Sequence, residues 1–221
     1  MKELEMIKKI FVLLLLPLSI LAQNDPKAEA ILEKVSQTNK AYKDIQVKFS
    51  YELNNQQAGI KDKRDGELTL SGNQFRLQLM GQDIYSDGKI VWYVMKEDLE
   101  VHIKSVDEFK AETDLDPANI FNQYDKGFKS KFYKEETVDG KACNTIDLFP
   151  EDPSKKPYSR VRLGIDKNSN HIVYSETFGK DGTNYKLVVA EMKTDQGVNG
   201  SLFKFDQAKY EAQDFDIVDF R

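Results

Sequence analysis

The sequence predicts a mainly-β protein built on one highly curved antiparallel sheet, or incomplete barrel, with helices across its mouth. Two observations predict the sheet: about ten short segments alternate apolar with polar residues, and turn signals separate them. A third adds the helices, because a helical pattern precedes the strands and a second segment interrupts them. A period of two is typical of antiparallel strands with one buried and one solvated face. A meander of this many strands curves into a barrel-like sheet.

The alternating segments extend through most of the chain. The clearest are Ile45–Leu53, Leu68–Leu70, Phe75–Leu79, Leu99–Ile103, Val161–Ile165 and Tyr185–Val189. The turn signals are Gly72-Asn73, Asp87-Gly88, Asp139-Gly140, Asn168-Ser-Asn170 and Asp181-Gly182. Asp-Gly between alternating segments is a strong signal for a β-hairpin. Neighbouring segments are therefore expected to pair, and the stretch Pro150–Pro157 is expected to be an exposed loop.

One amphipathic helix is predicted ahead of the strands. Asp25-Pro26 marks its start, since Asp is a favoured N-cap and Pro a favoured first helical residue. The apolar residues fall on one face at helical spacing, and they are Ala28, Ile31, Leu32, Val35 and Tyr42. The helix is expected to cover the open sheet as part of a lid, with Ile31 and Val35 facing the strands.

A second segment, residues 106–127, loses the strand alternation. Asp116-Pro117 is again a helix-start signal, and two short helices separated by a loop fit the pattern. We expect this segment to be a mobile lid rather than barrel strands, with Ile120 and Phe121 among its lid residues.

The N-terminal segment has the pattern of a secretory signal peptide. Lys8 and Lys9 precede an apolar run, Ile10–Leu16, and the segment closes on Ala22. The run is shorter than the roughly 20 apolar residues of a spanning helix, which weighs against a membrane anchor. A lipoprotein signal needs a cysteine at the cleavage point, where Gln23 stands instead. The expectation is that residues 1–22 are removed and that residues 23–221 form one soluble domain in the periplasm.

Charge and cysteine content narrow the function. Without residues 1–22 the chain keeps 29 basic and 35 acidic residues. An acidic protein is a poor nucleic-acid binder, since such binding depends on neutralising phosphates. The single cysteine, Cys143, cannot form an internal disulfide, so packing alone must hold the fold. We expect a monomer with no nucleic-acid partner.

Signatures of catalysis are missing from the sequence. His102 and His171 lie far apart in strand contexts, where exposed strand residues are the simpler interpretation. No His, Cys, Asp and Glu cluster has zinc-ligand spacing, and no phosphate loop or nucleophile elbow is present. Cys143 has no nucleophile signature, so a buried structural thiol is expected. We therefore predict no catalytic residue, metal or cofactor, and a binding protein rather than an enzyme.

The strands supply a large apolar face that predicts either a packed core or a ligand cavity. A half-open sheet under helices leaves room for an apolar cavity. The residues expected to line such a cavity are Phe49, Tyr51, Leu68, Phe75, Leu77, Trp92, Ile103, Leu163 and Leu187.

Three segments carry a resemblance to a known family. The run Gly66–Arg76 resembles the second and third strands of LolA-type outer-membrane lipoprotein carriers. The run Ser86–Tyr93, with Asp87-Gly-Lys and Trp92, resembles that family's next hairpin. The C-terminal Leu202–Asp206, followed by Asp216–Asp219, is similar to its closing pattern. The resemblance covers nearly all of the chain after the N-terminal segment.

The resemblance implies an unclosed antiparallel β-barrel of about ten to eleven strands covered by α-helices. It also implies a carrier that takes lipoproteins from an inner-membrane ABC transporter, shields their acyl chains and delivers them to an outer-membrane acceptor. One departure concerns the lid. Many members tether it with an Arg-Pro pair where this chain has Ser71-Gly72. A lipid-sensing or anti-sigma-factor-binding regulatory module of the same fold, and a hydrolase with a dispersed site, are the alternatives.

Overall fold

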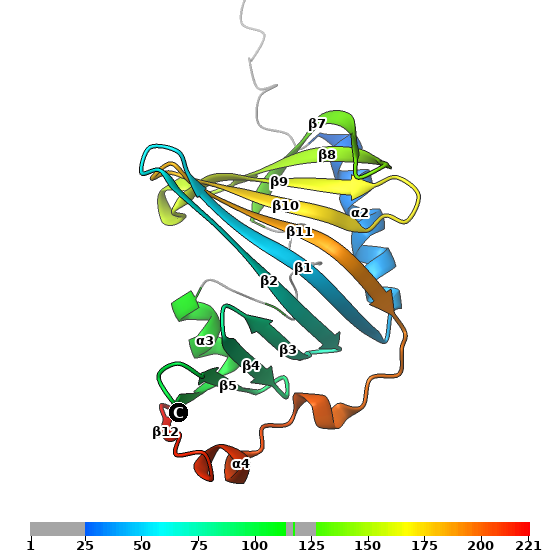
Figure 1. The fold of residues 1–221 in the computed structure, drawn as a ribbon. Helices are drawn as coiled ribbons and strands as arrows, with labels where there is room; N and C mark the ends of the chain where they lie inside the picture. The colour runs from blue at the N-terminus through cyan, green and yellow to red at the C-terminus, as the bar shows by residue number, and fades with distance from the viewer. Residues whose placement is uncertain (1–24, 114–116, 118–126) are drawn as a thin grey trace, which may run out of the picture.

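The computed structural model describes residues 25–113, 117 and 127–221, and one twelve-stranded sheet dominates it (Figure 1). The strands are β1 (Asp44–Asn55), β2 (Ile60–Ser71), β3 (Gln74–Leu79), β4 (Gln82–Ser86), β5 (Ile90–Met95), β6 (Glu100–Ser105), β7 (Phe128–Val138), β8 (Lys141–Pro150), β9 (Tyr158–Asp166), β10 (Ile172–Gly179), β11 (Thr183–Thr194) and β12 (Asp216–Asp219). The helical elements are α2 (Pro26–Ala41), α3 (Val106–Thr113), α4 (Gln207–Glu211) and the 3₁₀ turns η3 (Pro153–Lys155) and η4 (Gly200–Phe203).

The sheet is an unclosed barrel, as the sequence predicts. Its order is β12-β6-β5-β4-β3-β2-β1-β11-β10-β9-β8-β7, so two antiparallel meanders meet where β1 pairs with β11. The strands at the two ends of this order, β12 and β7, are the open edges. The sequence analysis missed one feature: β12 adds a short parallel strand to β6. The structure otherwise has the predicted antiparallel architecture.

The hairpin turns lie where the turn signals place them. Asp139 and Gly140 connect β7 to β8, and both have positive φ, as a tight hairpin turn of this twist requires. Leu99 was predicted to be the first residue of a strand, and this prediction is wrong. Its φ of 54° and its exposed side chain place it in the β5–β6 turn, and the strand begins at Glu100. The loop around η3 is mostly exposed, as expected.

Helix α2 starts and packs as predicted. The Asp25 side chain accepts a hydrogen bond from the Lys27 backbone amide at 2.9 Å, and Pro26 follows as the first helical residue. Ala28, Leu32 and Val35 are buried against the strands. We call the face of the sheet that packs against α2 the inner face, and the opposite face the outer face.

Both ends of α2 are tied to the sheet by polar contacts. At the start, the Asp25 amide donates to the Ser130 carbonyl at 3.1 Å, and its carboxylate accepts from the Phe132 amide at 3.0 Å. The hydrogen bond from the Phe132 amide to the Asp25 carboxylate is the main reason why the pKa of Asp25 lies below its ordinary value. At the end, the Tyr42 hydroxyl lies 2.9 Å from His171 Nε2. Tyr42 is the residue after the helix, not its last apolar position as predicted.

The C-terminal residues 200–219 cover the outer face of β3–β6, and we call them the C-terminal strap. Figure 1 shows the strap passing along these strands on the side away from α3. Its Phe205, Tyr210, Phe215 and Ile217 pack against Tyr85, Trp92, Val94 and Val101. Strands β4 and β5 therefore have buried side chains on both faces: Ile84 and Val91 on the inner face, and Tyr85 and Val94 on the outer face.

Candidate binding site on the inner face

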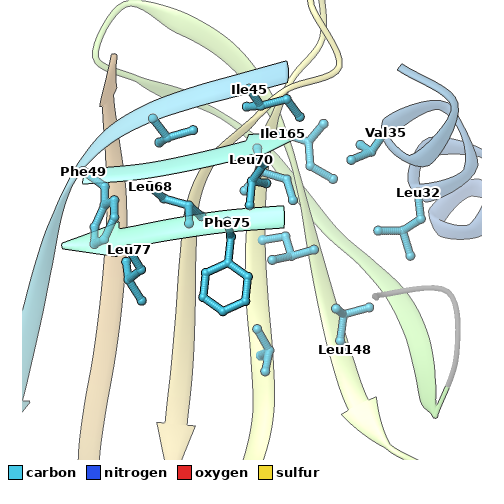
Figure 2. Packing of buried hydrophobic residues seen from close by; sticks show 14 of the residues in the cluster. Leu32, Val35, Ile45, Phe49, Leu68, Leu70, Phe75, Leu77, Leu148 and Ile165 are labelled. Atoms are coloured by element: carbon cyan, nitrogen blue, oxygen red, sulfur yellow. The ribbon is translucent and has the colours of Figure 1, made fainter. Parts of the chain in front are cut away.

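One apolar cluster joins α2 to the inner face of nearly every strand. Figure 2 shows Leu32 and Val35 pointing from the helix toward side chains of β1, β2, β3 and β9. Seven of the nine predicted cavity residues belong to this cluster or pack against it, namely Phe49, Tyr51, Leu68, Phe75, Leu77, Leu163 and Leu187. The structure thus brings together residues from the two meanders that the sequence separates by more than a hundred positions.

The other two predicted cavity residues, Trp92 and Ile103, are on the wrong face. Trp92 packs in the outer cluster under the C-terminal strap, where its ring stacks on Phe205 with centroids 5.8 Å apart. Ile103 is the direct cross-strand partner of Trp92, so it points to the same face. Tyr93 and Val91 hold the inner positions on β5 instead. The physical reason is that apolar residues of the strap pack on the outer face of β5 and β6. Apolar side chains are therefore buried on that face as well, and alternation alone does not tell the two faces apart.

Of the four predicted lid residues, two lie in helix α2 and two lie outside the described residues. Val35 is buried in the inner cluster and Ile31 packs against it. Ile120 and Phe121 lie outside the described residues. Within the predicted lid segment, α3 is helical and its buried Phe109 lies over Phe75, with ring centroids 6.4 Å apart. The sequence analysis did not select Phe109, although its spacing from Val106 is the spacing of one helical face.

Exposure of the inner face increases along β1, and the inner residues of its partner β11 are half-buried. Phe49 is buried, whereas Tyr51 and its cross-strand partner Leu187 are half-buried. Val189, which pairs with Phe49, is also half-buried. Leu79 and Tyr93 are the half-buried inner residues on β3 and β5. The packed core therefore continues into a partly uncovered apolar surface, which is where a long apolar ligand can bind without displacing the core.

A glycine shapes this surface. Gly66 pairs with Phe49, and a Cβ added at Gly66 would lie 2.5 Å from the Phe49 ring. The ring therefore lies directly over the β2 backbone, where only glycine leaves room. Gly164 has the same role on the outer face, beneath the ring of Tyr174.

Buried charges in the sheet are paired on the outer face. Asp83 accepts two hydrogen bonds from Arg76, at 3.0 and 2.8 Å, and one from the Tyr85 hydroxyl. Asp147 accepts two from Arg162, at 2.7 and 2.8 Å. These bonds raise the pKa of each arginine above its ordinary value. Because the carboxylates are fully engaged on the far side of the sheet, they stabilise the fold and do not face the candidate site.

The histidines and the cysteine have structural contacts. His102, half-buried in β6, lies 3.0 Å from a Glu100 oxygen. His171 precedes β10 and is also half-buried, and this burial lowers its pKa. Neither is the exposed strand residue that was expected. Cys143 is fully buried as predicted, which raises the pKa of its thiol. In residues 25–113, 117 and 127–221, no three His, Cys, Asp or Glu side chains are grouped as metal ligands.

A cavity of about 490 Å³ opens where α3 begins. Its walls combine the buried Phe75 with polar and basic side chains, including Asn73, Lys89, Ser105 and Lys110. The sequence analysis missed it because its walls come from two separate turns, the end of β6 and the start of α3. None of the described helices is long and apolar enough to cross a bilayer.

A comparison with family models decides the classification. Residues 40–206 match the model described as outer membrane lipoprotein carrier protein LolA. The chain belongs to the LolA family. The match covers β1 through η4, and therefore both meanders and the inner face. No curated protein matches the chain.

Solved structures of low sequence identity share the LolA-family fold of this chain. An uncharacterised conserved protein of Thermus thermophilus is 12% identical, with a TM-score of 0.59 over 87% of this chain and 99% of that one. Lipoprotein LppX of Mycobacterium tuberculosis is 15% identical, with a TM-score of 0.51 over 80% and 99%. The Pseudomonas aeruginosa MucA/MucB complex gives only 0.41, at 13% identity over 81% and 61%, and nothing is inferred from it.

Proposed function

We propose that this LolA-family protein is a periplasmic carrier, without catalytic activity, that binds lipoprotein acyl chains on its inner face. It shuttles them from an inner-membrane ABC transporter to an outer-membrane acceptor. The observation that carries the proposal is the apolar inner face, which passes from a buried core into the half-buried Tyr51, Leu187 and Val189 within an unclosed sheet.

The energetics favour a shielding role. Moving an acyl chain from water to an apolar surface is worth about 0.8 kcal/mol per CH₂, so a lipoprotein does not leave a membrane unaided. The inner face supplies apolar surface from both meanders, and α2 closes one side of it. Binding and release need no proton donor or nucleophile, which agrees with the structural contacts of His102, His171 and Cys143.

Native mass spectrometry of the protein, with and without a purified diacylated lipoprotein, tests the proposal. Leu187→Glu places a carboxylate on the half-buried inner face, where an unpaired charge is disfavoured, and should abolish the complex. Val188→Glu is the matched control, because Val188 is its half-buried neighbour on the outer face of β11. Loss of binding in both folded variants, or in neither, would contradict an inner-face site.

We also propose that the chain is exported and cleaved near Ala22-Gln23. The support is the short apolar run that follows Lys8 and Lys9, and the α2 start at Pro26 soon after. N-terminal sequencing of the exported protein should begin close to Gln23. A membrane-bound form that keeps residues 10–16 would overturn this part of the proposal while leaving the binding site intact.

A further inference from the structure

We propose that the Tyr51 and Tyr185 hydroxyls form a polar anchor that donates hydrogen bonds to the carbonyl group of an ester-linked acyl chain. This inference rests on the proposed function and assigns an orientation to the ligand. The carbonyl end lies at the tyrosine pair, and the hydrocarbon extends along the inner face toward Phe49 and the packed core.

The register of β1 and β11 places the two tyrosines side by side on the inner face. Tyr51 pairs with Leu187, and Tyr185 pairs with Leu53, so the tyrosines are diagonal neighbours. Their rings stack with centroids 6.0 Å apart and an interplanar angle of 24°. Stacking restrains both rings, and the Tyr185 hydroxyl is near enough to contribute to the raised pKa of Tyr51.

The surroundings change from apolar to polar at this pair. On one side lie the buried Phe49 and Val47. On the other side, Asn55 donates to the Thr183 hydroxyl at 2.9 Å, near the end of the β1–β11 ladder. An acyl ester has the same order, with an apolar chain and one polar group at its end. The match in polarity defines which end of the ligand lies where.

The hydroxyls also have hydrogen-bonding capacity to spare. Other tyrosine hydroxyls have protein partners: Tyr42 with His171, Tyr85 with Asp83 and with Tyr210, and Tyr174 with Glu136. Within the described part of the chain, no protein group forms a hydrogen bond with the hydroxyl of Tyr51 or of Tyr185. Both hydroxyls are accessible at the surface of the half-buried face, so a ligand acceptor or water can accept hydrogen bonds from them.

Burial favours the protonated, hydrogen-bond-donating form of the Tyr51 hydroxyl. It raises the pKa of Tyr51 to about 12, with Tyr185 as a second cause. The Tyr51 hydroxyl therefore stays protonated throughout the pH range in which the protein works. A neutral donor suits a neutral ester carbonyl, whereas it gives no advantage to a ligand that lacks an acceptor at that position.

Two ligands of equal chain length test the anchor by isothermal titration calorimetry: 1-palmitoylglycerol, with an ester carbonyl, and 1-O-hexadecylglycerol, with an ether instead. The wild-type protein should bind the ester about five- to tenfold more tightly, the range expected for one or two net hydrogen bonds. Tyr51→Phe/Tyr185→Phe keeps the ring stack and should equalise the two affinities. It should do so by weakening the ester alone.

Tyr133→Phe is the control, because Tyr133 is an exposed tyrosine beside Arg162 on the outer face, away from the proposed site. It should keep the full ester preference. Equal binding of both ligands to the wild type, or an equal loss of preference in Tyr133→Phe, would overturn the anchor and leave the carrier function standing. Failure of both ligands and of lipoprotein to bind would instead overturn the proposed function.

Discussion

The outer face of the sheet differs between its two meanders. On β3 and β4, the Asp83–Arg76 pair lies under the C-terminal strap, where the Tyr85 hydroxyl bridges Asp83 to the Tyr210 hydroxyl. On β8 and β9, the Asp147–Arg162 pair is bordered by the Tyr133 ring, 3.8 Å from the guanidinium, and Tyr133 is 51% exposed. The same kind of ion pair is thus buried in both meanders, beneath the strap in one and among side chains of the sheet itself in the other.

This difference shows what the strap does for the fold. Strands β3–β6 are short, and β4, β5 and β6 have the apolar residues Tyr85, Trp92, Val94 and Val101 on the outer face, so this face needs a cover. Strands β8–β10 are longer, and polar or charged groups protect their outer face from solvent. Truncating a large side chain on the outer face should therefore lower the free energy of unfolding far more at β3–β6 than at β8–β10.

The largest effect is expected from Tyr210→Ala. Tyr210 is buried, stacks on Phe205 at 5.0 Å and meets Phe215 at 5.1 Å, so its loss opens a cavity between strap and sheet. The free energy of unfolding should fall by about 3–5 kcal/mol. Urea denaturation followed by circular dichroism measures it. Tyr133→Ala, in the uncovered region, should cost less than about 1 kcal/mol, and equal losses would refute the comparison.

A smaller effect is expected from adding a methyl group beneath each aromatic ring. Gly164→Ala would place a Cβ 2.1 Å from the Tyr174 ring, which the Glu136 carboxylate holds through a 2.7 Å hydrogen bond. Gly66→Ala meets the Phe49 ring, which has only apolar packing to hold it. Both should destabilise by about 1–3 kcal/mol.

The two glycine variants should differ in a second measurement. Gly164→Ala is expected to be the less stable of the two, because its ring cannot move aside without breaking a bond. Gly66→Ala is expected to weaken lipid binding, because it shifts Phe49 on the inner face. Thermal unfolding and calorimetric titration of 1-palmitoylglycerol report the two properties, and the opposite assignment would contradict the division into faces.

A pH-dependent effect should come from Glu136 in the uncovered region. Hydrogen bonds from Lys134, Tyr174 and Thr145 lower its pKa from 4.5 to about 2. Because the folded-state pKa is depressed, its stabilisation is fully present above pH 4.5 and is lost as the pH falls toward 2. The stability gap between the wild type and Glu136→Gln, from urea midpoints, should therefore narrow between pH 6 and pH 3. A constant gap would show that the carboxylate's charge is not the cause.

The smallest effect is expected from His102→Ala. His102 lies at the edge of the first meander with its Nε2 near Glu100 and its ring 4.9 Å from Phe220. A carrier needs no proton transfer from it, so lipoprotein binding in native mass spectrometry should be unchanged. If a folded His102→Ala protein lost function while Leu187→Glu kept it, the search should turn to a catalytic site.

Much of the fold was predictable because alternation and turn chemistry act locally. Asp139-Gly140 requires a hairpin whatever surrounds it, and Asp25-Pro26 starts a helix from its own side chain. The face on which a strand is buried is not local. Trp92 alternates correctly with Tyr93, yet only the strap, more than a hundred residues later, decides that Trp92 points outward.

The candidate site was predictable to a similar depth. Phe49, Leu77 and Leu163 could be selected because one apolar phase is enough to identify them. The tyrosine anchor could not be predicted. Tyr51 and Tyr185 come together through the pairing of β1 with β11, which joins the two meanders. The sequence shows two tyrosines 134 positions apart and no signal that joins them.

The open edges at β12 and β7 have a mechanical consequence. In a closed barrel the girth is fixed, because every strand is hydrogen-bonded on both sides and widening breaks a whole ladder. Among the described residues, the strands of the two meanders are hydrogen-bonded to each other only at the β1–β11 seam, and a change of twist along it moves the edges apart with every backbone pair intact. The interior is therefore compliant, and its girth can adjust to the bulk of what it holds.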